Sequence, residues 1–153
     1  MAETTAPKGV AYHMSNNRHG TPHARSHIMN PRAEDLKRRT FAFGVRVVRF
    51  CRSLRTTWEG REFSDQLFRS GTRVGANYRS ACRARSHADF VAKLGFVVEE
   101  ADESVYWLDM IAAAGINCGD DLAALLAEAS ELSRIFNQSQ ITAKANAQSR
   151  RNT

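Results

Sequence analysis

The stretch that decides the fold runs from Ser86 to Gly115 and reads SHADFVAKLGFVVEEADESVYWLDMIAAAG. Its first four residues resemble a helix capping box with Asp89 in place of the usual Glu or Gln. Gly115 stands where a C-terminal cap is expected. Between these signals, apolar and small residues recur at steps of three and four, the period of one helix face: Phe90, Leu94, Val97, Ala101, Ser104, Leu108 and Ile111.

Three other segments repeat this period. The first follows an Asn30-Pro31 helix start and contains Leu36, Thr40, Phe43, Val47, Phe50 and Leu54. Residues 56–60 interrupt the pattern, and the second segment then contains Leu67, Ser70, Val74, Asn77/Tyr78 and Ala81. The last segment contains Leu122, Leu125, Ala129, Leu132, Phe136 and Ser139. No segment resembles a strand, so we predict an all-α fold, an antiparallel up-down-up-down four-helix bundle over residues 31–145.

Several residues of this bundle have a structural rather than a chemical interpretation. Gly71 and Gly75 lie inside the second predicted helix, where glycine costs roughly 1 kcal/mol relative to alanine, and therefore indicate close backbone approach. Asn77 and Tyr78 lie near its core stripe and are interpreted as an interhelical hydrogen-bonding pair. Trp107 flanks the core stripe of the third helix.

The two ends of the chain have a different character. Residues 1–30 contain Pro, Gly and four of the five histidines without apolar periodicity, and we predict a disordered extension there. Residues 146–153 are predicted to be a flexible basic tail. No apolar run is long enough for a signal peptide or a membrane span, so a cytoplasmic protein is expected. The three cysteines form no disulfide or zinc pattern, and neither a metal nor another cofactor is expected.

Charge is divided sharply along the chain. Residues 1–85 contain 17 Lys and Arg against 6 Asp and Glu, a net +11. Residues 86–136 contain 2 against 10, a net −8, and residues 137–153 add +3. The basic and acidic helices could neutralise each other within one subunit or between subunits. The third interpretation is an arginine face that binds a polyanion.

The third predicted helix has a second line of residues behind its core stripe, at the same spacing of three and four. A monomeric bundle has little reason to expose apolar groups in such a line. We therefore predict a subunit interface made of Phe96, Glu99, Glu103, Tyr106 and Met110. The acids in it would meet arginines of the next subunit.

An enzyme is not expected, and we assign no catalytic residue. A carboxylate-bridged metal bundle needs inward Glu residues with Glu-x-x-His partners. The only bundle histidine, His87, stands at a helix start, away from the paired acids of the third helix.

A long motif gives the chain a family resemblance. The run from Gln66 to Ala81 reads QLFRSGTRVGANYRSA and is followed by matching residues at 84–86, 89–90, 93–94, 99–103 and 106–108. Over about residues 35–144, these features resemble the four-helix-bundle proteins encoded in intervening sequences of 23S ribosomal RNA genes. Arg73 departs from the small polar residue that is commoner there, and Cys118-Gly119 departs from a commoner Ser-Glu helix start.

The resemblance implies a ring-shaped homopentamer whose role is not well established and for which nucleic-acid binding is the usual inference. Related accessory proteins of diversity-generating retroelements bind a reverse transcriptase. We therefore expect self-assembly and RNA binding, with a protein-interaction scaffold as the alternative. The candidate RNA contacts are the arginines of the first two helices and the turn after them, namely Arg38, Arg39, Arg46, Arg49, Arg52, Arg69, Arg73, Arg79, Arg83 and Arg85.

Overall fold

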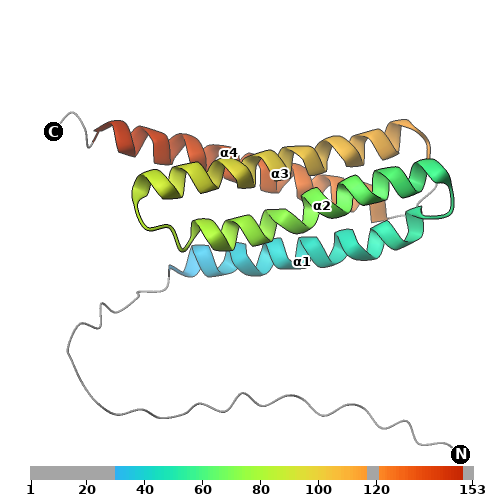
Figure 1. The fold of residues 1–153 in the computed structure, drawn as a ribbon, viewed down its shortest axis with the longest axis horizontal. Helices are drawn as coiled ribbons and strands as arrows, with labels where there is room; N and C mark the ends of the chain where they lie inside the picture. The colour runs from blue at the N-terminus through green and yellow to red at the C-terminus, as the bar shows by residue number, and fades with distance from the viewer. Residues whose placement is uncertain (1–29, 117–120, 150–153) are drawn as a thin grey trace, which may run out of the picture.

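The computed structural model describes residues 30–116 and 121–149. These residues form four helices, α1 (Pro31–Leu54), α2 (Trp58–Ala81), α3 (His87–Ala113) and α4 (Asp121–Ser149), and contain no strand (Figure 1). The predicted all-α fold is confirmed for this part of the chain. Helix α4 continues to Ser149, so the fourth helix is longer than the bundle boundary at residue 145 implied. The predicted extension before residue 30 lies outside the described residues.

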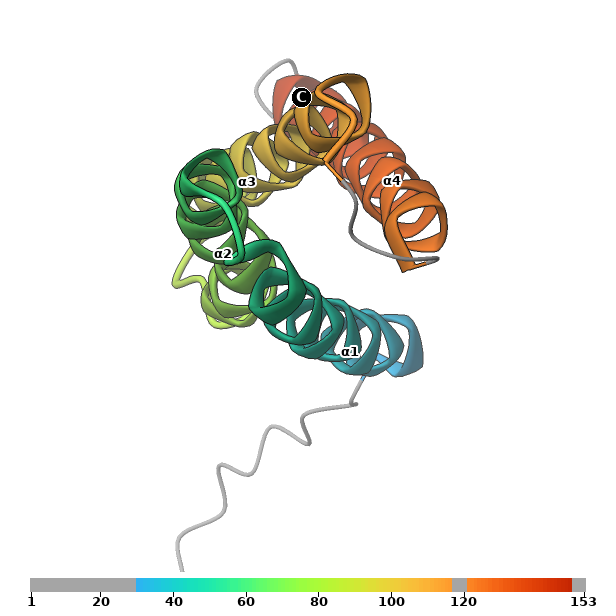
Figure 2. The same ribbon diagram turned by 90° about the vertical axis from the view of Figure 1, so that its right-hand side faces the viewer.

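Each helix packs against its neighbour in the sequence, and α2 lies between α1 and α3 (Figure 2). The turn between α1 and α2 and the turn between α2 and α3 lie at opposite ends of the molecule (Figure 1). Packing between α1 and α4 is the least extensive of the four helix pairs. None of the described helices combines the length and apolar character that a membrane crossing needs.

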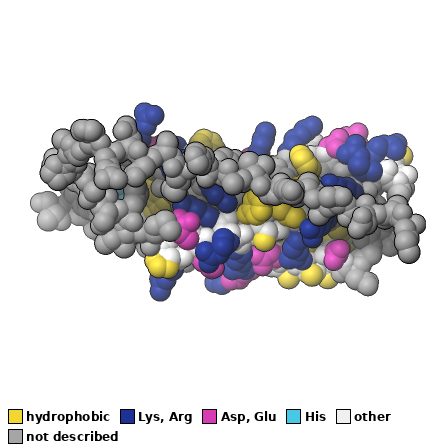
Figure 3. Space-filling model, turned by 90° about the horizontal axis from the view of Figure 1, so that it is seen from below, with side chains coloured by type: hydrophobic (Ala, Val, Ile, Leu, Met, Phe, Trp, Pro, Cys, Tyr) yellow, Lys and Arg dark blue, Asp and Glu magenta, His cyan; other side chains and the backbone are white. Residues whose placement is uncertain are grey.

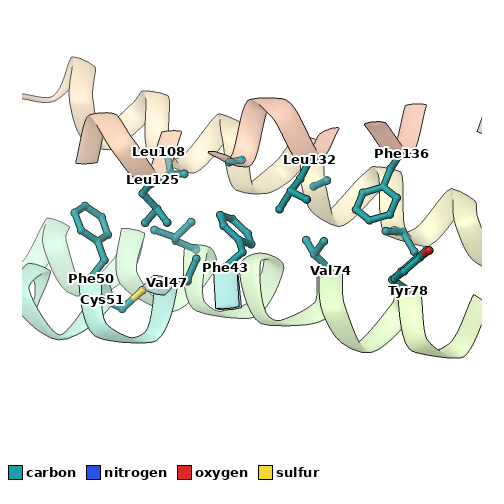
Figure 4. Packing of buried hydrophobic residues seen from close by; sticks show 14 of the residues in the cluster. Phe43, Val47, Phe50, Cys51, Val74, Tyr78, Leu108, Leu125, Leu132 and Phe136 are labelled. Atoms are coloured by element: carbon teal, nitrogen blue, oxygen red, sulfur yellow. The ribbon is translucent and has the colours of Figure 1, made fainter. Parts of the chain in front are cut away.

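The core is made of the predicted stripes. Phe43 and Val47 of α1 meet Val74 of α2, Leu108 of α3 and the leucines of α4 in one continuous cluster (Figure 4). The largest fully buried side chains, among them Phe136, Leu94 and Leu132, each expose less than 2% of their surface. At roughly 25 cal/mol per Å² of apolar surface removed from water, this cluster is the main source of stability. Cys51 joins it as well, and burial raises the pKa of its thiol to about 11.

The ends of α3 follow the sequence signals closely. Ser86 Oγ accepts a hydrogen bond from the Asp89 backbone N–H at 3.1 Å. The Asp89 carboxylate accepts at 2.9 Å from the backbone N–H of Arg85, one residue earlier than in a standard capping box. At the other end, Gly115 adopts φ 66°, and the N–H groups of Gly115 and Ile116 return to the carbonyls of Ala112 and Ile111. This is a Schellman C-cap.

Glycines allow α1 and α2 to approach closely. A Cβ on Gly71 would stand 2.8 Å from a Val47 methyl, and one on Gly75 would stand 3.3 Å from the Thr40 carbonyl oxygen. The close backbone approach expected at both glycines is therefore present. The sequence pattern predicts a break between helices at Gly60, but this residue lies in the first turn of α2, where a Cβ would stand 1.9 Å from the Leu54 carbonyl oxygen. The turn between α1 and α2 ends before residue 60, earlier than the sequence pattern predicts, because Gly60 lets α2 begin directly against the end of α1.

The prediction that Asn77 and Tyr78 of α2 form hydrogen bonds to another helix is wrong. Within residues 30–116 and 121–149, no hydrogen bond joins the side chain of Asn77 or Tyr78 to another helix. Tyr78 instead packs its ring against Phe136 of α4, with centroids 5.1 Å apart, as Figure 4 shows. Burial raises the pKa of Tyr78 above its ordinary value. Tyr78 therefore contributes to the core through the apolar contact of its ring with Phe136.

Candidate nucleic-acid interface

The ten candidate arginines lie on α1, α2 and the turn that follows α2, and the structure separates them by their partners. Three form ion pairs inside the chain: Arg38 with Asp35 at 3.0 Å, Arg39 with Glu128 at 2.7 Å, and Arg73 with Glu100 at 3.4 Å. Their charges are at least partly compensated, which makes them poorer candidates for phosphate binding.

The Arg39–Glu128 pair is the most strongly bonded of the three. Arg39 Nε and one terminal nitrogen donate to the two carboxylate oxygens at 2.7 and 2.9 Å. This is the two-pronged geometry in which a guanidinium binds a carboxylate best. The pair joins α1 to α4, where helix packing is least extensive. Arg39 therefore has a bundle-closing role in addition to its charge.

The carboxylate of Glu100 on α3 is less well compensated than that of Glu128. Its side chain is 16% exposed, and its Oε2 atom has no hydrogen-bond partner in the described residues. Burial raises the pKa of the Glu100 carboxyl, while Arg73 acts in the opposite direction. Arg73, where the resemblance marked a departure from the family pattern, therefore compensates a half-buried acid.

The other seven arginines have no carboxylate within ion-pair distance in the part of the chain that the structure describes. Arg46 is half-buried and the rest are exposed. Figure 3 views the molecule from the α1 side and shows Lys and Arg side chains around a central hydrophobic patch. Arg79 and Arg85 lie near enough to Glu34 and Asp89 to help lower the pKa values of those carboxyls, but neither forms an ion pair with them. Guanidinium groups without an ion-pair partner attract polyanions. These seven are Arg46, Arg49, Arg52, Arg69, Arg79, Arg83 and Arg85.

A groove of about 580 Å³ runs between α1 and α2. Gly44, Gly75 and Ala76 leave it open because they have almost no side chain. An adjoining hollow of about 280 Å³ shares Val48 and Arg52 with it and continues along the same two helices. We call both together the α1/α2 groove; its principal side chains are Phe41, Val45, Val48, Arg49, Arg52 and Arg79. Sequence reasoning identified its arginines but missed the groove, because it depends on how two helices cross.

The second line of α3 lies on the surface, as its spacing predicted. Phe96 and Tyr106 expose 57% and 54% of their surface, and Glu99 and Glu103 are also exposed. Met110 is half-buried. We call Phe96, Glu99, Glu103, Tyr106 and Met110 the α3 outer line.

Trp107 supports this line from the side that faces α2. Its ring lies 6.1 Å from Phe63 of α2 and 5.0 Å from Tyr106 between centroids. Its indole N–H donates to Glu103 at 3.0 Å. Tyr106 and Glu103 are therefore held in place although both are exposed. Within residues 30–116 and 121–149, no three His, Cys, Asp or Glu side chains come together as metal ligands would.

The geometry alone does not show to which protein family the chain belongs, and a comparison with family models does. The model of the 23S rRNA-intervening sequence protein family matches residues 34–138. The chain belongs to this family. The match begins in α1 and ends in α4, so it includes both the α1/α2 groove and the α3 outer line of this family member.

A solved structure supports the same assignment. The chain is similar to a protein of unknown function from the S23 ribosomal protein family of Bacteroides thetaiotaomicron, at 29% identity and a TM-score of 0.64. The alignment covers 71% of this chain and 96% of that protein. No curated protein matches this chain. The family and the fold are thereby established, whereas the activity has to be inferred from the surface.

Proposed function

We propose that this chain is a non-enzymatic cytoplasmic protein that binds RNA through the arginines that have no ion-pair partner among its described residues. In this proposal the helices form an antiparallel bundle that assembles into a homopentameric ring. The observation that supports RNA binding most directly is the set of seven arginines on α1, α2 and the following turn that lack an intramolecular carboxylate partner among the described residues. A guanidinium donates two parallel hydrogen bonds to a phosphate, which suits a sequence-independent grip on an RNA backbone.

Salt dependence tests the proposal. Each phosphate contact releases counterions, so log K falls with log salt at about 0.7 to 0.9 per contact. Five contacts would weaken binding on the order of a thousandfold between 50 and 300 mM salt. Fluorescence anisotropy with a labelled, structured RNA oligonucleotide measures this directly. A Kd that stays constant over the same range would contradict RNA binding through arginines.

Arg83 and Arg85 provide the sharpest variants because both are exposed and lie outside the α1/α2 groove. Replacing both with Glu is expected to weaken RNA binding at least tenfold without loss of helix content. The control is Arg134→Glu, which makes the same charge change per replaced residue on α4, where Arg134 already pairs with Glu131 at 2.7 Å. A scaffold that acts only through protein contacts would show no measurable RNA binding in the unmodified protein.

A further inference from the structure

The α1/α2 groove has a chemistry that suits an amphipathic helix better than an RNA backbone. Phe41 is 63% exposed, and Val45 and Val48 line the groove beside it. A phosphate backbone would leave these apolar groups against charged oxygen and water. A helix with apolar residues flanked by carboxylates would cover them and would also meet Arg49 and Arg52.

Such a helix face exists on the molecule itself. The α3 outer line presents Phe96, Tyr106 and Met110 with Glu99 and Glu103 between them. Its charge is opposite to that of the groove. α1 and α3 share the core but are not neighbouring helices, because α2 lies between them, and the groove and the α3 outer line both lie on the outside of the molecule (Figure 2). The two surfaces therefore cannot meet within one chain and are available to two different copies.

The lengths of the two surfaces agree. From Phe41 to Arg55 and from Met110 back to Phe96 are both fourteen positions, roughly 21 Å of helix at 1.5 Å per residue. One helix of this length can therefore cover the whole groove.

The antiparallel direction matches the chemistry of the two surfaces. With Met110 placed at Phe41, Tyr106 falls at Val45, so these two apolar residues cover the apolar part of the groove. Phe96 falls at Arg55, at the far end of the groove, where it would pack on the stem of an arginine that pairs with Asp65. In the same register Glu99 falls at Arg52. Glu103 falls at Val48, one position from Arg49, which a side chain of this length can reach.

The parallel direction gives a poorer match at Glu99, whereas Glu103 falls at Val48 in both directions. With Phe96 placed at Phe41, Glu99 falls at Gly44, over the apolar part of the groove, where burying a carboxylate without a partner is costly. Tyr106 then falls one position from Arg52, so this arginine meets an aromatic ring in place of an acid.

We propose that the α1/α2 groove receives the α3 outer line of a second copy in antiparallel register, pairing Arg49 with Glu103 and Arg52 with Glu99. The inference rests on the proposed self-assembly and adds the contacts that create it. The contact is heterologous because groove and line are different surfaces, so each copy uses one of each and successive copies join head to tail. A ring closes such a series without leaving either surface exposed. Arg49 and Arg52 then serve assembly, and Arg83 and Arg85 remain for RNA.

A charge exchange tests the pairing. Arg52 and Glu99 are the suitable pair because both are exposed and neither has an ion pair in the described residues. Sedimentation velocity is expected to give an oligomer for the unmodified protein and the 17.1 kDa monomer for Arg52→Glu and for Glu99→Arg alone. The double variant is expected to recover the oligomer, because the two exchanged charges are again opposite in sign across the contact between copies. Arg83→Glu is the control and is expected to assemble normally, and circular dichroism checks that every variant keeps its helices.

The outcomes separate this inference from the proposed function. An unmodified protein that sediments as a monomer would overturn self-assembly and the docking together. An oligomer that survives Arg52→Glu would overturn the docking alone. Loss of the oligomer in both single variants without recovery in the double variant would overturn the antiparallel register.

Discussion

The negative charge of Glu100 works against the stability of the folded protein. Its carboxylate is half-buried between α2 and α3, one oxygen has no hydrogen bond, and Arg73 approaches only to 3.4 Å. Desolvation raises the pKa of its carboxyl. A raised pKa means that the folded protein binds the proton more readily than the unfolded chain does. The stabilising effect of that proton is present at low pH and is lost as pH rises through the folded-state pKa.

We therefore expect Glu100→Gln to raise the free energy of unfolding at pH 7 by up to about 1 kcal/mol. The gain should shrink as pH falls toward 4, because the native Glu100 then becomes neutral too. Urea denaturation at pH 7 and pH 4 measures both effects. The control is Glu62→Gln on the exposed face of α2, which should change stability by less than about 0.5 kcal/mol. A destabilised Glu100→Gln protein at pH 7 would show that the Arg73 pair outweighs desolvation.

At the scale of the helices, the crossing of α1 and α2 decides the shape of the molecule's basic side. Gly71 faces the fully buried Val47 with no room for a Cβ, whereas a Cβ on Gly44 would find its nearest neighbour at an ordinary 3.7 Å. Both glycines lie in the same helix pair, but only one of them is required by the packing. The groove therefore depends on the spacing that Gly71 permits.

Gly71→Ala is expected to destabilise the protein by about 1 to 3 kcal/mol, because its methyl group would overlap Val47 in a closely packed core. Gly44→Ala, on the facing helix, is expected to stabilise by up to about 1 kcal/mol through its higher helix propensity. Thermal unfolding monitored by circular dichroism compares the two. Equal effects of the two substitutions would mean that the crossing can relax around Gly71.

At the scale of the whole molecule, the bundle is closed by the pair of helices that pack least. The Arg39–Glu128 pair spans α1 and α4, while Arg38, the preceding residue, forms an exposed pair with Asp35 on its own helix. Both adjacent arginines form an ion pair with a carboxylate, but one pair joins two helices and the other lies exposed on a single helix. Their substitution separates the closing effect from the loss of a positive charge.

Arg39→Gln is expected to lower the free energy of unfolding by about 1 to 2 kcal/mol, since it breaks two charge-assisted hydrogen bonds and leaves Glu128 unpaired. Arg38→Gln should change it by less than about 0.5 kcal/mol, because that pair is exposed to solvent. Hydrogen exchange should show faster opening of α1 and α4 in Arg39→Gln only. Comparable losses in the two variants would indicate a general charge effect instead.

Local signals in the sequence predicted the helices and the core but not the contacts between distant residues. Val47, Leu94 and Leu132 follow a helical period, and this period is sufficient to place them inside. The prediction fails at Gly60 because the cost of glycine in a helix is local, whereas its fit against Leu54 is tertiary. The Arg39–Glu128 pair joins residues 89 positions apart, so no local pattern indicates it. The α1/α2 groove was missed for the same reason.

The order in which the helices pack also bears on how the chain folds. α1 packs on α2, α2 on α3, and α3 on α4, so most contacts join segments that are already close along the chain. Such proteins fold on the order of microseconds to milliseconds, and pairs of helices can form before the rest of the chain is in place. During synthesis, α1 and α2 could therefore pair before α4 leaves the ribosome. The contact between α1 and α4 would form last, and Arg39→Gln should then accelerate unfolding while leaving the refolding rate nearly unchanged.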